Sequence, residues 1–260
     1  MAPPRPDDPE TGALPGYGPA SYGDGFADVY DDWYADVSPS GATARFVAAR
    51  TAGPVLELGS GTGRLAAPMR LAGLDVVGLD ASTAMLRRSL DQHPDVPVVA
   101  ADMAELPVRM RAFGAVLVAF NTLFNLTTTA AQRRCLTQAG QSLAPGGLAI
   151  VEAFVPGGGA GEASDRVDVV RMDADLVVLR VSRTDPARGT VAGHHVELRD
   201  GAPVRLRPWQ LRFSAPDELD RLAAAAGLHL VERHGGWEGE AFDDASDLHV
   251  SVYGVVEGRR

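Results

Sequence analysis

The chain has 260 residues, a formal net charge of −10, and 24 basic residues that are all arginine. Such an acidic chain is unsuited to broad contact with nucleic acid or an anionic membrane, and without lysine it cannot form a Schiff base or a lysine-containing phosphate loop. The single cysteine, Cys135, excludes an internal disulfide and a cysteine-rich metal site. We expect a cytoplasmic protein without signal peptide or membrane span.

The N-terminal part begins with a polar segment and continues with aromatic residues. Residues 1–20 are rich in Pro, Gly and Asp, so burial cannot offset their ordering entropy and we expect a disordered tail. Aromatic and aliphatic side chains then recur at three- and four-residue spacing over 22–34, which predicts an amphipathic helix. With a second helix expected over 40–51, residues 21–51 form an N-terminal helical lid.

Strands and helices alternate over 52–156. We expect strands at 54–59, 75–80, 96–101, 114–120 and 147–154, and helices at 62–72, 82–91 and 130–143. This alternation predicts a parallel sheet with right-handed crossovers, which forms the cofactor-binding core. Pro68 lies inside the first of these helices and should loosen or kink it.

The pattern changes over 157–213: after a glycine-rich start, polar and apolar residues alternate over 165–213. Turn signals at Asp173, Asp185 and Asp200 divide this stretch into three or four short antiparallel strands. We expect a small β-insertion that acts as a substrate cap or a dimer contact.

Residues 214–258 should return to the core. A helix is expected to begin near Ser214 and to end at Gly227. The strands expected at 228–234 and 248–256 leave no room for a helix between them, so they should form a hairpin. The fold class is therefore α/β, a doubly wound, Rossmann-like, mostly parallel sheet of seven strands with a C-terminal hairpin strand.

A glycine turn joins the first expected strand to the first helix. Residues 55–63 read V-L-E-L-G-S-G-T-G, a G-x-G-x-G spacing, whereas a dinucleotide fingerprint needs glycine where Arg64 stands. A ligand with adenosine at one end and no phosphates therefore fits better than a pyrophosphate. Asp80 ends the second strand, where it can accept hydrogen bonds from both hydroxyls of a ribose; a helix cap is the alternative role.

Together with Glu57, two residues before Gly59, this turn resembles motif I of the class I S-adenosylmethionine-dependent methyltransferases. The resemblance covers residues 22–256 and implies S-adenosylmethionine as methyl donor, S-adenosylhomocysteine as product, and no metal. It implies that Asp102 receives the adenine amino group and that Met103 packs against the ring; for Asp102 a surface turn is the alternative. The cofactor-binding residues implied are Tyr30, Glu57, Gly59, Ser60, Gly61, Gly63, Asp80, Ala81, Met85, Asp102, Met103, Phe120 and Asn121.

The only two asparagines of the chain follow the fourth expected strand. Asn121 and Asn125 lie at the carboxyl end of the sheet, where open α/β folds bind ligands. Phe120 is a candidate for the adenine face, and Asn125 for orienting the acceptor atom. Ordinary capping is the alternative for Asn125, because asparagine favours helix starts and turns.

Two branches of the family look closest. The segment 22–31 resembles the N-terminal lid of the aminodeoxysugar N,N-dimethyltransferases of actinomycete antibiotic pathways, which implies Tyr22 near the substrate amine and Tyr30 over the cofactor. Their HH-E element is matched by residues 194–197, but they usually carry histidine near the position of Asn125. Residues 121–124, N-T-L-F, instead resemble bacterial peptide α-N-methyltransferases.

Both branches methylate amines, so the resemblance implies N-methylation of a small molecule or peptide of specialised metabolism, with a homodimer as the oligomer to test. In-line transfer depends mainly on alignment, worth roughly 7–11 kcal/mol, so a dedicated base is optional. The catalytic candidates are Tyr22 and Asn125, as positioning residues. The alternatives are O-methylation of a sugar or polyketide hydroxyl and, from a different class, an inactive cofactor-binding partner subunit.

Overall fold

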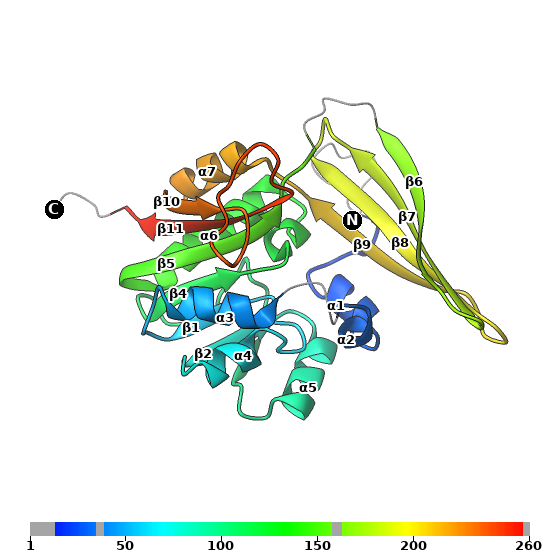
Figure 1. The fold of residues 1–260 in the computed structure, drawn as a ribbon, viewed down its shortest axis with the longest axis horizontal. Coiled ribbons are helices and arrows are strands. Elements are labelled where there is room, and N and C mark those ends of the chain that lie inside the picture. Colours follow the sequence, from blue (N-terminus) through cyan, green and yellow to red (C-terminus); the bar gives the residue numbers. More distant parts are fainter. Residues whose placement is uncertain (1–13, 35–38, 158–162, 257–260) are drawn as a thin grey trace, which may run out of the picture.

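The computed structural model of the chain describes residues 14–34, 39–157 and 163–256. Two β-sheets lie side by side, and Figure 1 shows the four-stranded sheet extending away from the larger, helix-covered one. Most of the expected N-terminal tail, residues 1–13, falls outside the described residues.

The larger sheet has the strand order β10-β11-β5-β4-β1-β2-β3. Its strands are β1 (Val55–Leu58), β2 (Val76–Asp80), β3 (Val98–Ala100), β4 (Phe113–Val118), β5 (Leu143–Phe154), β10 (Leu228–His234) and β11 (Leu248–Val255). Strands β1 to β5 pair in parallel, whereas β11 is antiparallel to both β5 and β10. The expected fold class, including the C-terminal hairpin, is confirmed.

Helices cover both faces of this sheet because successive strand residues point to opposite sides. In β1, Leu56 and Leu58 face the cluster that includes residues of α6 and α7, whereas Val55 faces the cluster that includes residues of α3 and α4. The helices of the core are α3 (Ser40–Ala48), α4 (Ala66–Leu71), α5 (Thr83–Gln92), α6 (Thr129–Ser142) and α7 (Pro216–Ala225), with a 3-10 turn η1 (Thr122–Asn125) after β4.

The four-stranded sheet, here called the insertion sheet, is antiparallel throughout, in the order β6-β7-β8-β9. It consists of β6 (Ser164–Met172), β7 (Leu176–Asp185), β8 (Thr190–Arg199) and β9 (Arg205–Arg212). Asp168, Arg180, His195 and Arg207 are cross-strand neighbours on the inner face, toward the lid. The next row, Val169, Leu179, Val196 and Leu206, lies on the outer face.

The continuous helix expected over 22–34 is wrong, because the segment forms two short helices, α1 (Ser21–Phe26) and α2 (Tyr30–Trp33). The amide of Val29 bonds to the carbonyl of Phe26 instead of continuing the α-helical pattern. The carbonyl of Gly25, which would accept that amide in a helix, accepts a hydrogen bond from Arg207 at 2.6 Å. A side chain from a distant strand therefore ends the first helix.

The position expected for Pro68, inside a helix over 62–72, is also wrong. Helix α4 begins at Ala66, later than expected, because Gly61 and Gly63 adopt positive φ values of 55° and 85° in the preceding turn. Pro68 therefore lies in the first turn of the helix, where a backbone N–H has no helical partner to lose.

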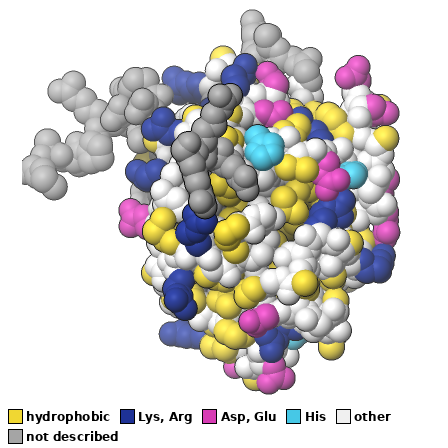
Figure 2. Space-filling model, turned by 90° about the vertical axis from the view of Figure 1, so that its left-hand side faces the viewer, with side chains coloured by type: hydrophobic (Ala, Val, Ile, Leu, Met, Phe, Trp, Pro, Cys, Tyr) yellow, Lys and Arg dark blue, Asp and Glu magenta, His cyan; other side chains and the backbone are white. Residues whose placement is uncertain are grey.

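Figure 2 shows the face of the molecule that lies toward the C-terminal strands of the larger sheet. Arginine, acidic and hydrophobic side chains are interspersed on this face, and none of these kinds forms a continuous field. No basic groove is visible among the described residues on this face.

Candidate active site

A cavity of about 620 Å³ lies at the carboxyl end of the parallel strands. Its walls come from the turns of the core, from α1 and α2, and from the inner face of the insertion sheet. We call the part formed by the core turns the cofactor half and the part between lid and insertion sheet the acceptor half. The core contributes Gly59, Gly61, Leu79, Asp80, Ala81, Met85, Ala101, Asp102, Met103, Phe120, Asn121, Thr122, Asn125, Leu126 and Phe154.

The glycine turn after β1 is fastened to the end of β2 through Asp80. One carboxylate oxygen of Asp80 accepts the amide of Gly61 at 2.9 Å, and the other accepts the amide of Ser82 at 2.8 Å. Ser82, not Asp80, is the N-cap of α5, since its hydroxyl accepts the amide of Met85. Each carboxylate oxygen has a second lone pair, so Asp80 keeps acceptor capacity toward the cavity.

The end of β3 presents the second acid of the cofactor half. Asp102 and Met103 both line the cavity, and one Asp102 oxygen accepts the amide of Ala104 at 2.8 Å. Met85, on α5, lines the same wall and is buried. This wall therefore offers what an adenine needs: Asp102 can accept a hydrogen bond from the amino group, and the thioethers of Met85 and Met103 can pack against the ring.

A small cavity of about 20 Å³ adjoins the glycine turn and holds Glu57, Ser60 and Arg64 in its lining. Burial raises the pKa of the Glu57 carboxyl to about 8, although the charge of Arg64 opposes the shift. One Glu57 oxygen and the Ser60 hydroxyl are enclosed without a hydrogen-bond partner among the described residues. Such unsatisfied polar atoms next to a cavity are typical of a site built for a polar ligand group.

The lid carries aromatic side chains into both halves. Tyr22 stacks on Phe26 with ring centroids 4.6 Å apart, and Tyr30 packs against Tyr34 at 4.9 Å. Tyr22, Tyr30, Trp33 and Tyr34 all line the cavity. Burial raises the pKa of the Tyr30 phenol to about 12, so it remains protonated at neutral pH.

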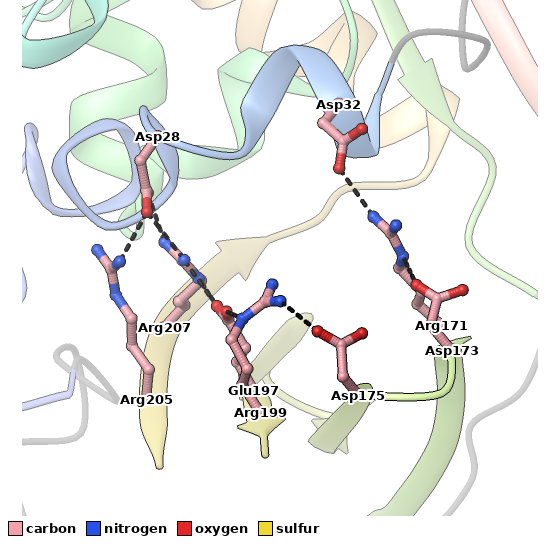
Figure 3. Close-up of polar contacts among 9 residues, drawn as sticks. All are labelled: Asp28, Asp32, Arg171, Asp173, Asp175, Glu197, Arg199, Arg205 and Arg207. Carbon is pink, nitrogen blue, oxygen red and sulfur yellow. Dashed lines mark hydrogen bonds and ion pairs between the residues drawn. The ribbon is translucent and has the colours of Figure 1, made fainter. Parts of the chain in front are cut away.

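Aspartates fasten the lid on two sides. On the core side, Asp24 accepts the Ser82 hydroxyl at 2.6 Å, and Asp31 accepts the Thr62 hydroxyl at 2.5 Å. On the insertion side, Asp28 pairs with Arg205 and Arg207, and Asp32 pairs with Arg171, as Figure 3 shows. These contacts connect the lid both to the turns of the cofactor half and to the insertion sheet.

Arg207 is the central residue of the lid attachment. Its side chain is 1% exposed, and its five N–H groups are matched by five contacts, to Gly25 and Asp28 of the lid and to Glu197 of β8. A buried guanidinium is stable only when its donors are satisfied in this way.

The insertion sheet closes the acceptor half with Val170, Arg180, Val191, His195, Trp209 and Leu211. His195 is buried between Phe26, Trp33 and Trp209, with ring centroids 5.3, 5.6 and 6.3 Å away. Burial lowers the pKa of His195 to about 4, and the charges of Arg180 and Arg207 act in the same direction. The imidazole is therefore neutral at physiological pH.

The structure brings most of the residues expected from sequence to one cavity. Twelve line it: Tyr22, Tyr30, Gly59, Gly61, Asp80, Ala81, Met85, Asp102, Met103, Phe120, Asn121 and Asn125. Glu57 and Ser60 line the small adjoining cavity. Gly63 lines neither; it has φ +85°, and a Cβ there would lie 2.8 Å from the Ser89 hydroxyl, so this glycine allows α5 to approach the turn.

The insertion was expected as a substrate cap, but sequence reasoning did not assign its individual residues to the site, above all Arg180, His195 and Trp209. The available signal was the two-residue alternation in β8, which places Val191, Gly193 and His195 on one face. That alternation does not say which face is covered, so these residues were not assigned to the site.

Comparisons with known proteins agree with this geometry. A family model described as a methyltransferase domain matches residues 55–147. The structure of the CcbJ methyltransferase from Streptomyces caelestis is 39% identical and covers 93% of this chain and 100% of that chain, with a TM-score of 0.86.

The chain belongs to the class I S-adenosylmethionine-dependent methyltransferases. S-adenosylmethionine is the methyl donor and S-adenosylhomocysteine the product. A second relative, the dTDP-3-amino-3,4,6-trideoxy-alpha-D-glucopyranose N,N-dimethyltransferase of Streptomyces venezuelae, is 27% identical over 90% of this chain and 94% of that enzyme. The demethylmenaquinone methyltransferase of Renibacterium salmoninarum is 34% identical over 100 residues, which span only 40% of its length.

The residues of this methyltransferase fit the donor. Gly59 and Gly61 have φ values of 67° and 55°, so backbone without side chains faces the cavity, and Asp80 offers acceptors for ribose hydroxyls. The enclosed polar atoms of Glu57 and Ser60 lie beside the glycine turn, where the methionine end would need polar partners. Within the described residues, no group of three or more His, Cys, Asp or Glu side chains is arranged to hold a metal, and no helix is long and apolar enough to cross a membrane.

Proposed function

We propose that this methyltransferase transfers a methyl group to an amine of a small molecule or short peptide of specialised metabolism. The observation that carries the proposal is the acceptor half itself, a space continuous with the cofactor half but covered by lid and insertion sheet. A covered cavity of this size suits a small acceptor and excludes the wide contact that a nucleic acid needs. The preference for nitrogen comes from the N,N-dimethyltransferase relative.

The lining of the acceptor half suits an uncharged amine. The carboxylates that line the described cavity, Asp80 and Asp102, belong to the cofactor half, whereas Arg180 and neutral His195 face the acceptor half. Among the described residues that line this half, a protonated amine would find no carboxylate. Because only the free amine has a lone pair for attack, the same electrostatics favour the reactive form.

The bound donor supplies an electrophilic methyl group on a sulfonium. The residues of the chain align the acceptor nitrogen with that methyl group, for which Tyr22 and Asn125 are the proposed contacts, and keep water away from it. Aromatic side chains of the lid and the insertion sheet make the space apolar. Alignment of this kind is worth roughly 7–11 kcal/mol, so no dedicated base is required.

The outer face of the insertion sheet has a separate proposed role. Val167, Val169 and Leu206 are 64%, 57% and 57% exposed on this face, next to the partly covered Leu179 and Val196. Contiguous exposed apolar side chains on one sheet face are typical of a protein interface. We propose that two copies of the chain pair through this face.

The reaction class can be tested with labelled S-adenosylmethionine and matched acceptors. The panel contains dTDP-3-amino-3,4,6-trideoxy-α-D-glucopyranose, its 3-hydroxy counterpart, and short peptides with free or acetylated amino ends. We expect transfer to amines and not to the hydroxyl or acetylated partners, read by mass spectrometry. Transfer to the hydroxyl compound alone would support the O-methyltransferase alternative, and tight donor binding without transfer to any acceptor would favour the inactive partner subunit.

A further inference from the structure

The turn after β4 has an unusual backbone. Phe120 and Asn121 have φ values of 51° and 61°, so two consecutive residues with side chains adopt the left-handed region. That region is unfavourable for residues with a Cβ, most of all for a bulky one such as phenylalanine. Both residues line the cavity, so the strained turn belongs to the site.

One residue of the neighbouring strand holds both amides of this turn. The Glu152 carboxylate accepts the amide of Phe120 at 2.6 Å, and the Glu152 carbonyl accepts the amide of Asn121 at 3.2 Å. Asn121 returns a contact to β5, because its side-chain oxygen accepts the amide of Phe154 at 2.7 Å. Glu152 is only 6% exposed, and burial raises its pKa, so a buried acid is kept here at an energetic cost.

The conformation of this turn shapes the cofactor half. The Phe120 ring lies 5.8 Å from the ring of Tyr34 and 5.4 Å from the guanidinium of Arg64, between the lid and the small cavity. The next residue, Thr122, packs onto the glycine turn: its methyl carbon lies 2.3 Å from where a Cβ on Gly59 would be. If the turn relaxed to negative φ, both contacts would shift.

We propose that Glu152 is a positioning residue for the methyl donor, which acts by holding the Phe120–Asn121 turn in its left-handed conformation. Backbone strain that persists beside a ligand cavity needs surrounding contacts that over-determine it, and Glu152 supplies two of them. Glu152 does not line the cavity, so it acts through the turn and not by touching the donor. The inference concerns donor binding and is independent of which acceptor is methylated.

The test separates the reach of the Glu152 side chain from its charge. Glu152→Gln keeps an oxygen at the same distance from the Phe120 amide but removes the charge, whereas Glu152→Asp keeps the charge and shortens the side chain. S-adenosylhomocysteine binding is measured by titration calorimetry, and exchange of the Phe120 amide by NMR. We expect Glu152→Gln to bind within a few-fold of the wild type and Glu152→Asp to bind about tenfold more weakly, with faster exchange of the Phe120 amide.

Ser251→Ala is the matched control. Ser251 is fully buried on β11, next to β5, and its hydroxyl contacts Arg233 and His249 instead of the site. Loss of this hydroxyl in Ser251→Ala should lower the melting temperature of the protein and leave its affinity for S-adenosylhomocysteine unchanged. The proposal is overturned if Glu152→Asp binds like the wild type, or if Glu152→Gln is weakened as much as Glu152→Asp, since the length of the side chain would then not decide affinity.

Discussion

Asp80 serves both the fold and the proposed ribose contact. Its two oxygens accept the amides of Gly61 and Ser82, so Asp80→Ala removes the link between the glycine turn and α5 as well as the acceptor for the donor. We expect weaker S-adenosylhomocysteine binding, by on the order of 1.5–3 kcal/mol for each lost charged hydrogen bond, and a lower melting temperature of the free protein. Calorimetric titration and thermal unfolding measure the two effects. The exposed Asp91 on α5 is the control, and Asp91→Ala should change neither quantity.

Glu57 makes the stability of the free protein depend on pH. Burial raises its pKa from 4.5 to about 8, so between these values the folded chain keeps a proton that the unfolded chain has lost. The contribution of Glu57 to the free energy of unfolding therefore falls as the pH rises from 4.5 to about 8. Above about pH 8 this destabilising contribution stays constant. Glu57→Gln removes this penalty.

We expect the stability gain of Glu57→Gln to grow across that pH range, on the order of 1.4 kcal/mol for each unit between the two pKa values. Urea unfolding of both proteins at pH 5, 6.5 and 8 measures the difference, in which the other titrating groups cancel. A gain that is the same at all three pH values would contradict the assignment of a neutral Glu57.

The contrast between Asp80 and Glu152 shows which site residues a sequence can reveal. Asp80 was predicted because the turn, the helix and the second strand are consecutive in the chain, so spacing alone places the acid beside the glycines. Glu152 lies 32 residues from the amide it accepts, and its role depends on β5 being the neighbour of β4. Periodicity within one strand carries no information about such a contact.

At the scale of elements, the lid was predicted as one helix and is two. Hydrophobic spacing correctly indicated helical residues over 22–34, but the break at 27–29 is set by Arg207, 182 residues away from Gly25. The strands of the insertion sheet, in contrast, were predicted, because their polar–apolar alternation and their turn residues are local signals. Which face of that sheet covers the cavity depends on its contacts with the lid.

The attachment of the lid predicts a difference between two aspartates. Asp28→Ala leaves the buried Arg207 guanidinium with Glu197 as its remaining carboxylate, so we expect a loss of about 1.5–3 kcal/mol of stability, the range for a hydrogen bond to a charged group, and weaker S-adenosylhomocysteine binding. Asp32→Ala removes a pair with 69% and 42% exposed side chains, which should cost less than about 1 kcal/mol. Urea unfolding, calorimetry and hydrogen exchange over 21–34 compare the two variants. Equal losses would show that the buried Arg207 does not hold the lid.

At the scale of the whole molecule, the parallel core follows from the alternation of strands and helices, and the antiparallel β11 from the short connection that precedes it. The arrangement of the insertion sheet against the lid does not follow from any such rule. It depends on contacts between residues that are far apart in sequence, such as Asp28 with Arg205 and Arg207. The lid and the insertion sheet form the acceptor half, and their arrangement depends on such long-range contacts, which is why the acceptor could not be identified from sequence.

The outer face of the insertion sheet gives the prediction for assembly. The side chains of Val169 and Leu206 are more than half exposed on this face. If a second copy covered the face, their apolar surface would leave water, which stabilises the dimer by about 25 cal/mol for each Å² buried. We expect a dimer by light scattering at micromolar concentration, and a monomer when Val169→Glu and Leu206→Glu are combined, because the charges would be buried without partners. Leu71 on α4 is 90% exposed and isolated from this face, so Leu71→Glu should leave the dimer intact.

A wild-type protein that is monomeric throughout this range, or a double variant that stays dimeric, would exclude this face as the interface. Retained S-adenosylhomocysteine binding in the double variant would show that the loss is confined to assembly.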